Sequence, residues 1–266
     1  MFAVLFVNPH RDHLHLKLSM SIVHEKKVFP AKPDLPHGVE LAWFHLANDK
    51  PPTDHFNIVR GTTSVLTFQL LGCSEMESGT RSGEQTGIAQ VCDSVLLDDS
   101  DRPTDLMLRE INSRIASSSA LSDLKATLVL GKLNLTTGLM EISSAGHPSP
   151  LLLRSDKTLS DIVIAGPPLG AALDTRYQAN TARLLPGDAV VVYSDGVTNC
   201  LNPLDRKYGQ RRFRTDLIQT SEVTAGKVVE NIEERLEHWL GDKTVTDDAT
   251  LAVIGFSLDF PVTIET

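Results

Sequence analysis

The sequence has little of what marks several common protein classes. Only 3 of its 266 residues are cysteines, and these are Cys73, Cys92 and Cys200. They are widely spaced, odd in number and form no CxxC pair, so neither a disulfide framework nor a zinc knuckle is indicated. Basic residues are outnumbered, with 25 Lys and Arg against 34 Asp and Glu, and the formal net charge of −9 argues against a nucleic-acid-binding surface.

Long hydrophobic runs are also missing. The apolar stretch at residues 1–7 is too short to span a bilayer, and it lacks the basic flank and cleavage site of a secretory signal. We therefore expect a cytoplasmic protein that does not bind membranes. A hydrophobic content of 41% and a charged content of 22% are typical of a globular chain, and 266 residues can bury a sizeable core.

The first 36 residues are interpreted as an N-terminal segment that ends in a proline-rich connector at 29–36. Residues 2–7 could form a strand and 19–29 a short helix. His13 and His15 alternate with leucines, a pattern that suits either metal binding or the exposed face of a strand. A single domain is expected over 37–258, followed by a tail at 259–266.

Within that domain, apolar spacing predicts strands, then helices, then strands, a helix and a strand. Helical spacing marks 86–97, 104–116 (opened by Pro103 and a Thr104 cap, with Leu106 on its apolar face) and 222–240. The expected strands are 39–46, the hairpin 53–59 with 64–72, 126–133, 138–143, 150–154, 187–193 and 251–256. Clustered helices indicate an α+β layered fold with mostly antiparallel sheets.

A carboxylate follows the most apolar strand. A Pro186-Gly187-Asp188 turn leads into a continuous apolar run up to residue 193, which reads as a strand buried on both faces, and Ser194-Asp195-Gly196 ends it abruptly. Asp195 could bind a hard cation, and it could equally cap the turn that follows.

A second acidic stretch, Asp247-Asp248, comes directly before the last strand. If that strand and 187–193 were antiparallel neighbours, the carboxylates of Asp195 and Asp247 would meet at one edge of the sheet. Such oxygen donors suit Mg²⁺ or Mn²⁺. The alternative is that these residues only punctuate a loop.

Five short motifs now occur in order: Ala-Gly-His-Pro at 145–148, Gly-Pro-Pro-Leu-Gly at 166–170, Leu-Pro-Gly-Asp at 185–188, Ser-Asp-Gly-Val-Thr at 194–198 and Asp-Asp-Ala-Thr at 247–250. Together they resemble the SpoIIE/RsbU-type branch of the metal-dependent (PPM) protein serine/threonine phosphatases. Phe29-Pro30 and residues 39–42 resemble that family's entry segment, so the resemblance covers about residues 20–257.

The resemblance implies a four-layer α-β-β-α sandwich, two Mn²⁺ or Mg²⁺ ions at its edge, and hydrolysis of a phosphorylated serine or threonine by a metal-activated water. By position, Asp195 and Asp247 are the implied ligands of one ion. Gly196 and Asp54 also belong to the implied metal site: Gly196 lets the strand end approach it, and Asp54 orients metal-bound water. Asp54, Asp195 and Asp247 are the implied catalytic residues. Asp248, His147, Cys73 and Glu75 are possible accessory residues. The implied substrate is a phosphorylated partner-switching regulator such as an anti-sigma-factor antagonist.

The chain departs from the family pattern where two metal ions are normally bridged. Cys73 stands in place of the bridging aspartate, and a thiol is a poor ligand for Mg²⁺. Glu75 and Glu77 have the wrong spacing for a simple replacement. Asn199 stands where the family often has Glu, and Pro52-Thr53 replaces two glycines. We therefore expect weak or single-metal binding.

Two hypotheses of function remain open from the sequence. The first is a protein phosphatase with weakened metal binding. The second is a pseudophosphatase that acts as a protein-binding module, and a homodimer is possible in either case. His147 is interpreted as a structural histidine at a sheet corner, with a general acid near the phosphate as the alternative.

Overall fold

The computed structural model describes residues 3–5, 35, 38–48, 53–60, 64–73, 82–98, 102–121 and 126–256. Several features expected from the sequence lie outside these residues. They are the alternating His13 and His15, the helix at 19–29, the connector at 29–36 apart from Leu35, and Glu75 with Glu77.

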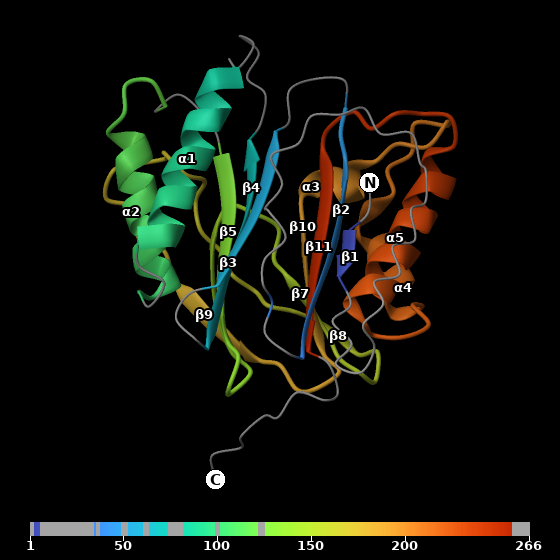
Figure 1. Ribbon diagram of the computed structural model, residues 1–266. Helices are drawn as coiled ribbons and strands as arrows, with labels where there is room; N and C mark the ends of the chain where they lie inside the picture. The colour runs from blue at the N-terminus through green and yellow to red at the C-terminus, as the bar shows by residue number, and fades with distance from the viewer. Residues whose placement is uncertain are drawn as a thin grey trace.

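Two antiparallel sheets form the centre of the fold (Figure 1). The six-stranded sheet has the spatial order β1 (Ala3–Leu5), β2 (Val39–Leu46), β11 (Ala249–Phe256), β10 (Ala189–Tyr193), β7 (Leu151–Leu153) and β8 (Leu159–Asp161). The five-stranded sheet has the order β3 (Asp54–Arg60), β4 (Val65–Cys73), β5 (Ala126–Asn134), β6 (Leu139–Ala145) and β9 (Ala179–Arg183). The strand expected within residues 2–7 is thus present as β1, paired with β2.

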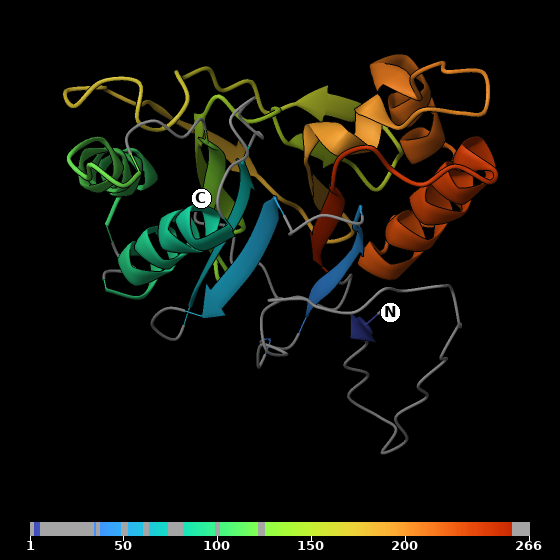
Figure 2. The ribbon, with the colours of Figure 1, turned by 90° about the horizontal axis from the view of Figure 1, so that it is seen from above.

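Helices cover the outer face of each sheet, which gives four layers in the view from above (Figure 2). On the five-stranded sheet lie α1 (Ser82–Asp98) and α2 (Thr104–Ala116), and on the six-stranded sheet lie α4 (Gly209–Ile218) and α5 (Ala225–Leu240). The short α3 (Asp195–Asn199) packs beside β11 and α4. The α-β-β-α sandwich expected from the family resemblance is therefore confirmed.

Three apolar clusters fill the spaces between these layers. One lies between the sheets and includes Phe68, Val190 and Ile254. A second joins the six-stranded sheet to α4 and α5, and a third joins the other sheet to α1 and α2. Successive residues of β10 belong to the first and second clusters in turn, so this strand is buried on both faces, as its continuous apolar run predicts.

The structure corrects the details of the second helix. Pro103 occupies the N-cap position, whereas Thr104 is already helical and its hydroxyl bonds Ser143. Leu106 is 44% exposed and Met107 is buried instead. The buried residues Leu108, Ile111 and Ile115 define the inner face of the helix. Met107 lies one turn before Ile111 on that face, whereas Leu106 lies on the opposite side of the axis. The first predicted helix is also longer than expected and begins at Ser82.

Four short elements were not predicted from the sequence, namely β8, β9, α3 and α4. The strands β8 and β9 are mostly exposed, so they carry no apolar alternation. In α4 only Phe213, Asp216 and Leu217 are buried, and the many arginines in its sequence leave no clear apolar periodicity. Among the described residues no helix is both long and apolar enough to cross a membrane.

A buried carboxylate locks the turn that leads into β10. Asp188, which is 2% exposed, accepts hydrogen bonds from the backbone N–H groups of Leu185 (2.8 Å) and Ser155 (3.1 Å) and from Arg154 (2.6 Å). It therefore ties the turn at 185–188 to the chain that follows β7. This gives the Leu-Pro-Gly-Asp motif a structural role.

We predict that Asp188→Ala lowers the free energy of unfolding by about 2–3 kcal/mol, because it removes the acceptor of two part-buried N–H groups and the buried carboxylate that pairs with Arg154. Urea denaturation measures the change. Asp174→Ala is the control, since Asp174 is exposed, and it should change stability by less than about 0.5 kcal/mol. Equal stability of the two variants would contradict the assigned role.

Candidate active site

The acidic segments at 195 and 247–248 come together through one strand pair. β10 and β11 are antiparallel neighbours, with Tyr193 opposite Leu251. The end of β10 therefore lies beside the start of β11, and the Asp195 carboxylate is close enough to Asp247 to raise the pKa of that carboxyl. The pairing expected from the sequence is confirmed, and it places both carboxylates at one edge of the sheet.

Gly196 permits this close approach. A Cβ atom at this position would lie 2.0 Å from the backbone oxygen of Asp248, a distance that real Cβ atoms do not reach. Only glycine lets the first turn of α3 pack directly on the chain before β11. As expected, the contribution of Gly196 is space for the backbone.

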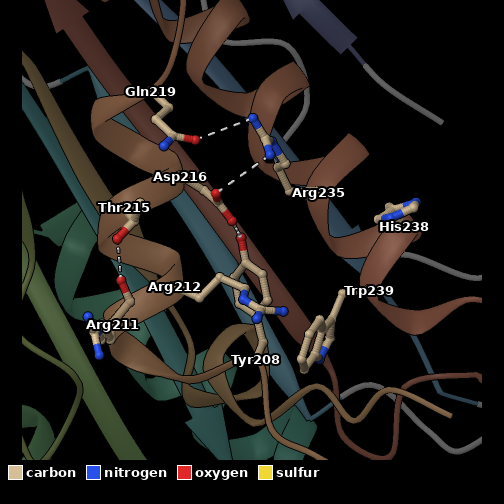
Figure 3. A pocket seen from close by; sticks show the side chains of 9 residues that line it. All are labelled: Tyr208, Arg211, Arg212, Thr215, Asp216, Gln219, Arg235, His238 and Trp239. Atoms are coloured by element: carbon tan, nitrogen blue, oxygen red, sulfur yellow. Dashed lines mark hydrogen bonds and ion pairs between the residues drawn. The ribbon is translucent and has the colours of Figure 1, made fainter. Parts of the chain in front are cut away.

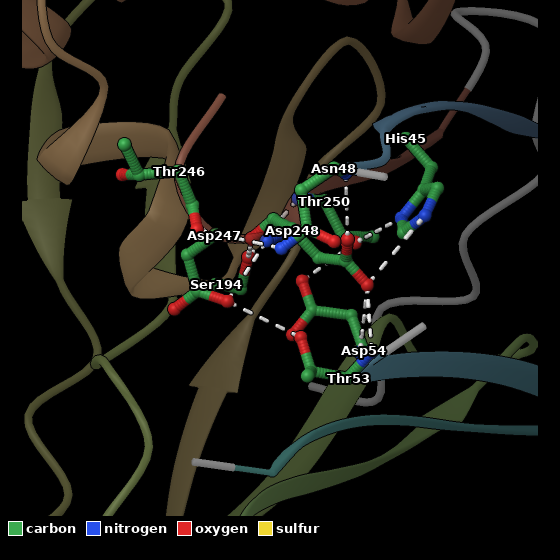
Figure 4. A network of polar contacts seen from close by, with 9 residues as sticks. All are labelled: His45, Asn48, Thr53, Asp54, Ser194, Thr246, Asp247, Asp248 and Thr250. Atoms are coloured by element: carbon green, nitrogen blue, oxygen red, sulfur yellow. Dashed lines mark hydrogen bonds and ion pairs between the residues drawn. The ribbon is translucent and has the colours of Figure 1, made fainter. Parts of the chain in front are cut away.

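Asp248 is the most deeply buried carboxylate of this edge, at 1% exposure. Its Oδ2 accepts the backbone N–H of Thr53 at 2.6 Å, and its Oδ1 accepts that of Asn48 at 3.2 Å (Figure 4). The Nε2 atom of His45 lies 3.8 Å from Oδ2. These donors compensate the burial of the carboxylate and hold the segment before β3 against the segment before β11.

Asp54 begins β3 on the opposite sheet and faces the same edge. Its Oδ2 accepts the hydroxyl hydrogen of Thr250 at 2.8 Å, and Thr250 in turn is 2.9 Å from His45. Burial raises the pKa of Asp54 well above its usual range, the hydroxyls of Ser194 and Thr250 lower it in part, and the neighbouring carboxylates raise it further. Asp54 is thus mainly a desolvated carboxyl that is held by hydroxyl donors.

Asp247 and Asp195 are both exposed, in contrast to Asp248. Asp247 accepts hydrogen bonds from the Thr53 hydroxyl (3.2 Å) and from the Asp248 backbone (2.9 Å). Burial of part of its carboxyl raises the pKa of Asp247, and Asp195 adds to the increase. Asp195 accepts a hydrogen bond from Asn199 at 3.2 Å. Within the described residues, neither carboxylate forms an ion pair with a lysine or arginine.

Cys73 lies at the end of β4, next to Asp54. Its backbone N–H donates to the Thr53 oxygen at 2.9 Å, and its side chain is 7% exposed. Burial raises the pKa of the Cys73 thiol to about 12, and Asp54 contributes to the rise. The thiol is therefore neutral, and a neutral thiol offers no negative charge to a cation.

The accessory residue His147 lies apart from this network. His147 is buried at 5% exposure, its backbone N–H donates to Ser144 (3.2 Å), and its Nδ1 lies 3.3 Å from the Pro148 oxygen. These partners all belong to its own sheet corner, which supports the structural interpretation of the Ala-Gly-His-Pro motif. Glu75 lies outside the described residues.

Four polar residues of the network carried no role in the sequence interpretation: His45, Thr53, Ser194 and Thr250. Ser194 and Thr250 fall inside quoted motifs, so their position was a usable signal. His45 gave none, because a histidine within an alternating strand is typical of an exposed face.

The four-layer sandwich with carboxylates gathered at one edge defines the class: a PPM-type phosphatase fold. The sequence model of the family described as Stage II sporulation protein E (SpoIIE) matches residues 86–257, and the chain belongs to this family. The SpoIIE/RsbU resemblance expected from the motifs is confirmed.

Individual relatives agree with this assignment. The chain is 28% identical over 152 residues to the phosphoserine phosphatase RsbU of Bacillus subtilis, which covers 56% of this chain and 44% of RsbU. It thus spans less than half the length of the curated relatives it matches. The fold resembles the SiaA-PP2C domain of Pseudomonas aeruginosa (TM-score 0.70, 15% identity, 82% of this chain and 85% of that one). It also resembles the PP2C phosphatase domain of SpoIIE from B. subtilis (TM-score 0.67, 16% identity, 82% and 63%).

The metal ions implied by the family can be tested against these residues. Among the described residues no group of three or more His, Cys, Asp or Glu side chains is placed to hold a metal ion. With a neutral Cys73 in place of the bridge, the site does not fit a two-ion centre. The exposed pair Asp195 and Asp247 does fit one ion, because Mg²⁺ is commonly held by one or two carboxylates and keeps several waters.

Burial of His147 leads us to predict that the free energy of unfolding depends on pH in the acid range. Desolvation lowers the pKa of His147 from 6.5 to about 4. Between these values the unfolded chain binds a proton that the folded chain does not, so the free energy of unfolding should fall as the pH drops through this window, by up to about 3 kcal/mol. The variant His147→Phe should lose that part of the pH dependence in urea melts at pH 4.5 to 7.

The matched control is His238→Gln, because His238 is exposed and should leave the slope unchanged. If His147→Phe and the parent showed the same slope between pH 4.5 and 7, the buried neutral state assigned to this ring would be wrong.

Proposed function

We propose that this domain is a SpoIIE/RsbU-type protein serine/threonine phosphatase that works with weakened, single-ion metal binding on a phosphorylated signalling regulator. The observation that carries the proposal is the β10–β11 pairing, which brings the exposed carboxylates of Asp195 and Asp247 to one edge. Among the residues that the structure describes, neither carboxylate has a basic partner, so the two repel each other and a divalent cation would relieve that repulsion.

Asp195 and Asp247 would hold the ion, which when bound lowers the pKa of a water and neutralises charge on the phosphoryl oxygens. The remaining roles belong to the chain. Gly196 keeps Asp195 against the Asp248 backbone, and the hydroxyls of Thr250 and Ser194 hold the Asp54 carboxyl toward the edge. With its pKa raised, Asp54 is suited to accept a proton from a water and to orient that water.

The substrate class follows from the relatives rather than from a visible pocket. RsbU is named as a phosphoserine phosphatase, and partner-switching regulators are the corresponding substrates expected from the family resemblance. We therefore propose a phosphorylated regulator such as an anti-sigma-factor antagonist as the substrate. Because the chain covers less than half of RsbU, this assignment concerns the phosphatase domain.

A second candidate is a pseudophosphatase that binds the partner without turning it over. It is favoured by the neutral thiol of Cys73 and by the donors that already satisfy Asp248. An edge whose buried carboxylate is held by protein groups keeps its shape without metal, so the domain could recognise a phosphoprotein as a binding module.

We predict weak hydrolysis of an aryl phosphate by the purified protein in the presence of Mn²⁺. Asp195→Asn or Asp247→Asn should lower the rate by about 100-fold or to background, because each removes one of two ligands. The control is Asp242→Asn, because Asp242 is exposed and takes no part in the acidic edge, so this variant should keep the parental rate. No detectable turnover together with flat Mn²⁺ calorimetry would decide for the pseudophosphatase.

We further predict that Cys73→Asp restores metal affinity, since it places a carboxylate beside Asp54 where the thiol now lies. Without metal the variant should melt at a lower temperature than the parent, and Mn²⁺ should raise its melting temperature more than that of the parent. Cys73→Asn, of the same shape and without the charge, should show no such Mn²⁺ response. An equal response of all three proteins would show that the bridging position is misassigned.

A further inference from the structure

A hollow on the outer face of the helical layer is lined by basic and aromatic side chains. It has about 540 Å³ of free volume and lies between α4 and α5 (Figure 3). Arg211 and Arg212 reach it from α4, Arg235 reaches it from α5, and Tyr208 and Trp239 form its aromatic wall. Nothing in the phosphatase proposal uses these residues.

The charge of this hollow differs in sign from that of the whole chain. The lining of the hollow has three guanidinium groups and one carboxylate, that of Asp216. Asp216 accepts a hydrogen bond from the Tyr208 hydroxyl and lies 3.9 Å from Arg235. Within the described residues no carboxylate pairs with Arg211 or Arg212. In a chain of net charge −9, this leaves a local excess of positive charge.

The guanidinium of Arg212 is held in place. It lies 3.7 Å from the centroid of the Trp239 ring, and the Trp239 Nε1–H donates to the Cys200 oxygen at 3.1 Å. Tyr208 meets the Trp239 ring at a steep angle with centroids 6.0 Å apart. A guanidinium fixed on an aromatic face loses little freedom when it binds an oxyanion, and its planar donors match carboxylate and phosphate geometry.

The indole ring of Trp239 is occupied by contacts within the protein. Because Arg212 covers one face of Trp239 and Tyr208 packs at an angle to the ring, the hollow is built to bind charge and not to stack a base. Exposed cations on two helices suit an extended chain with several negative groups better than one compact ion.

The hollow is also connected to the acidic edge. Cys200 directly follows α3, and its oxygen accepts hydrogen bonds from both Trp239 Nε1 and the Tyr208 backbone (2.8 Å). α3 begins at Asp195, and its five residues rise by roughly 7 Å. The Cys200 oxygen thus ties the end of this helix to the aromatic wall of the hollow.

We propose that the α4–α5 hollow binds an acidic peptide segment of a partner protein, through carboxylate or phosphate groups held by Arg211 and Arg212. The identity of that partner as the phosphorylated regulator rests on the proposed function. The binding itself needs neither metal nor turnover.

Trp239 provides a direct readout. The chain has two tryptophans, so Trp43→Phe leaves Trp239 as the single tryptophan reporter in the full chain. This protein, in EDTA and about 150 mM salt to screen diffuse attraction, would be titrated with acetylated hexaglutamate, with the same peptide carrying one phosphoserine, with hexaglutamine and with inorganic phosphate. We expect the two acidic peptides to change the Trp239 fluorescence and saturate, and hexaglutamine to have no effect.

Arg211→Gln combined with Arg212→Gln should raise the Kd of the acidic peptides by about tenfold. Arg214→Gln is the matched control, because Arg214 lies on the same helix but pairs with Asp161 outside the hollow, and it should change the Kd by less than about twofold. Equal effects of the two sets of variants would overturn the proposal, as would inorganic phosphate binding as tightly as the peptides.

The result separates from the phosphatase proposal. Asp195→Asn combined with Asp247→Asn should leave the Kd of the acidic peptides unchanged. If the protein has no phosphatase activity but Arg211→Gln with Arg212→Gln still weakens peptide binding, the hollow proposal holds and the phosphatase proposal fails. If the protein is an active phosphatase and these two substitutions leave the Kd unchanged, the hollow proposal fails and the phosphatase proposal stands.

Discussion

The antiparallel pairing of β10 with β11 is the interaction on which the rest of the site depends. It joins segments more than fifty residues apart, so that the chain leaving one strand meets the chain entering the other. Both strands are fully buried, which fixes their register through packing on two faces. Gly196 completes the arrangement, because its missing side chain lets α3 begin against the Asp248 backbone.

This pairing also concentrates negative charge, and the protein compensates that charge unevenly. Asp248 is buried and satisfied by backbone N–H groups, so its carboxylate is structural in this arrangement. Asp195 and Asp247 are left exposed with few donors, and Asp54 is held by hydroxyls with a raised pKa. A cation bound at the exposed pair would reduce the repulsion between the two carboxylates, whereas the neutral Cys73 thiol offers no negative charge to a second ion.

Positively charged arginines line the hollow between α4 and α5, and the short helix α3 connects this hollow to the acidic edge. The two regions share Cys200, whose oxygen anchors the aromatic wall of the hollow and which ends the helix that Asp195 begins. A phosphoprotein carries negative groups beyond its phosphoryl group, and a basic surface beside an acidic edge suits such a molecule. In the function that we propose, the acidic edge acts on the phosphoryl group and the basic hollow holds the acidic segment of the partner.

Much of the architecture was predictable from the sequence because long, strongly periodic segments leave few alternatives. The apolar run before Asp195, the helix that became α5 and the hairpin of β3 with β4 all follow from local spacing. The missed elements β8, β9 and α4 are short, exposed or arginine-rich, so burial left little periodic signal in them.

The fold class, the family and the candidate acidic residues could be inferred from the sequence, since ordered motifs and periodic apolar spacing are local properties of the chain. The burial of Asp248, the part of His45 and Thr53 in the network, and the hollow that the arginines of α4 share with Trp239 emerged with the folded arrangement. The physical reason is that solvation and charge pairing depend on neighbours that the fold brings from distant parts of the chain.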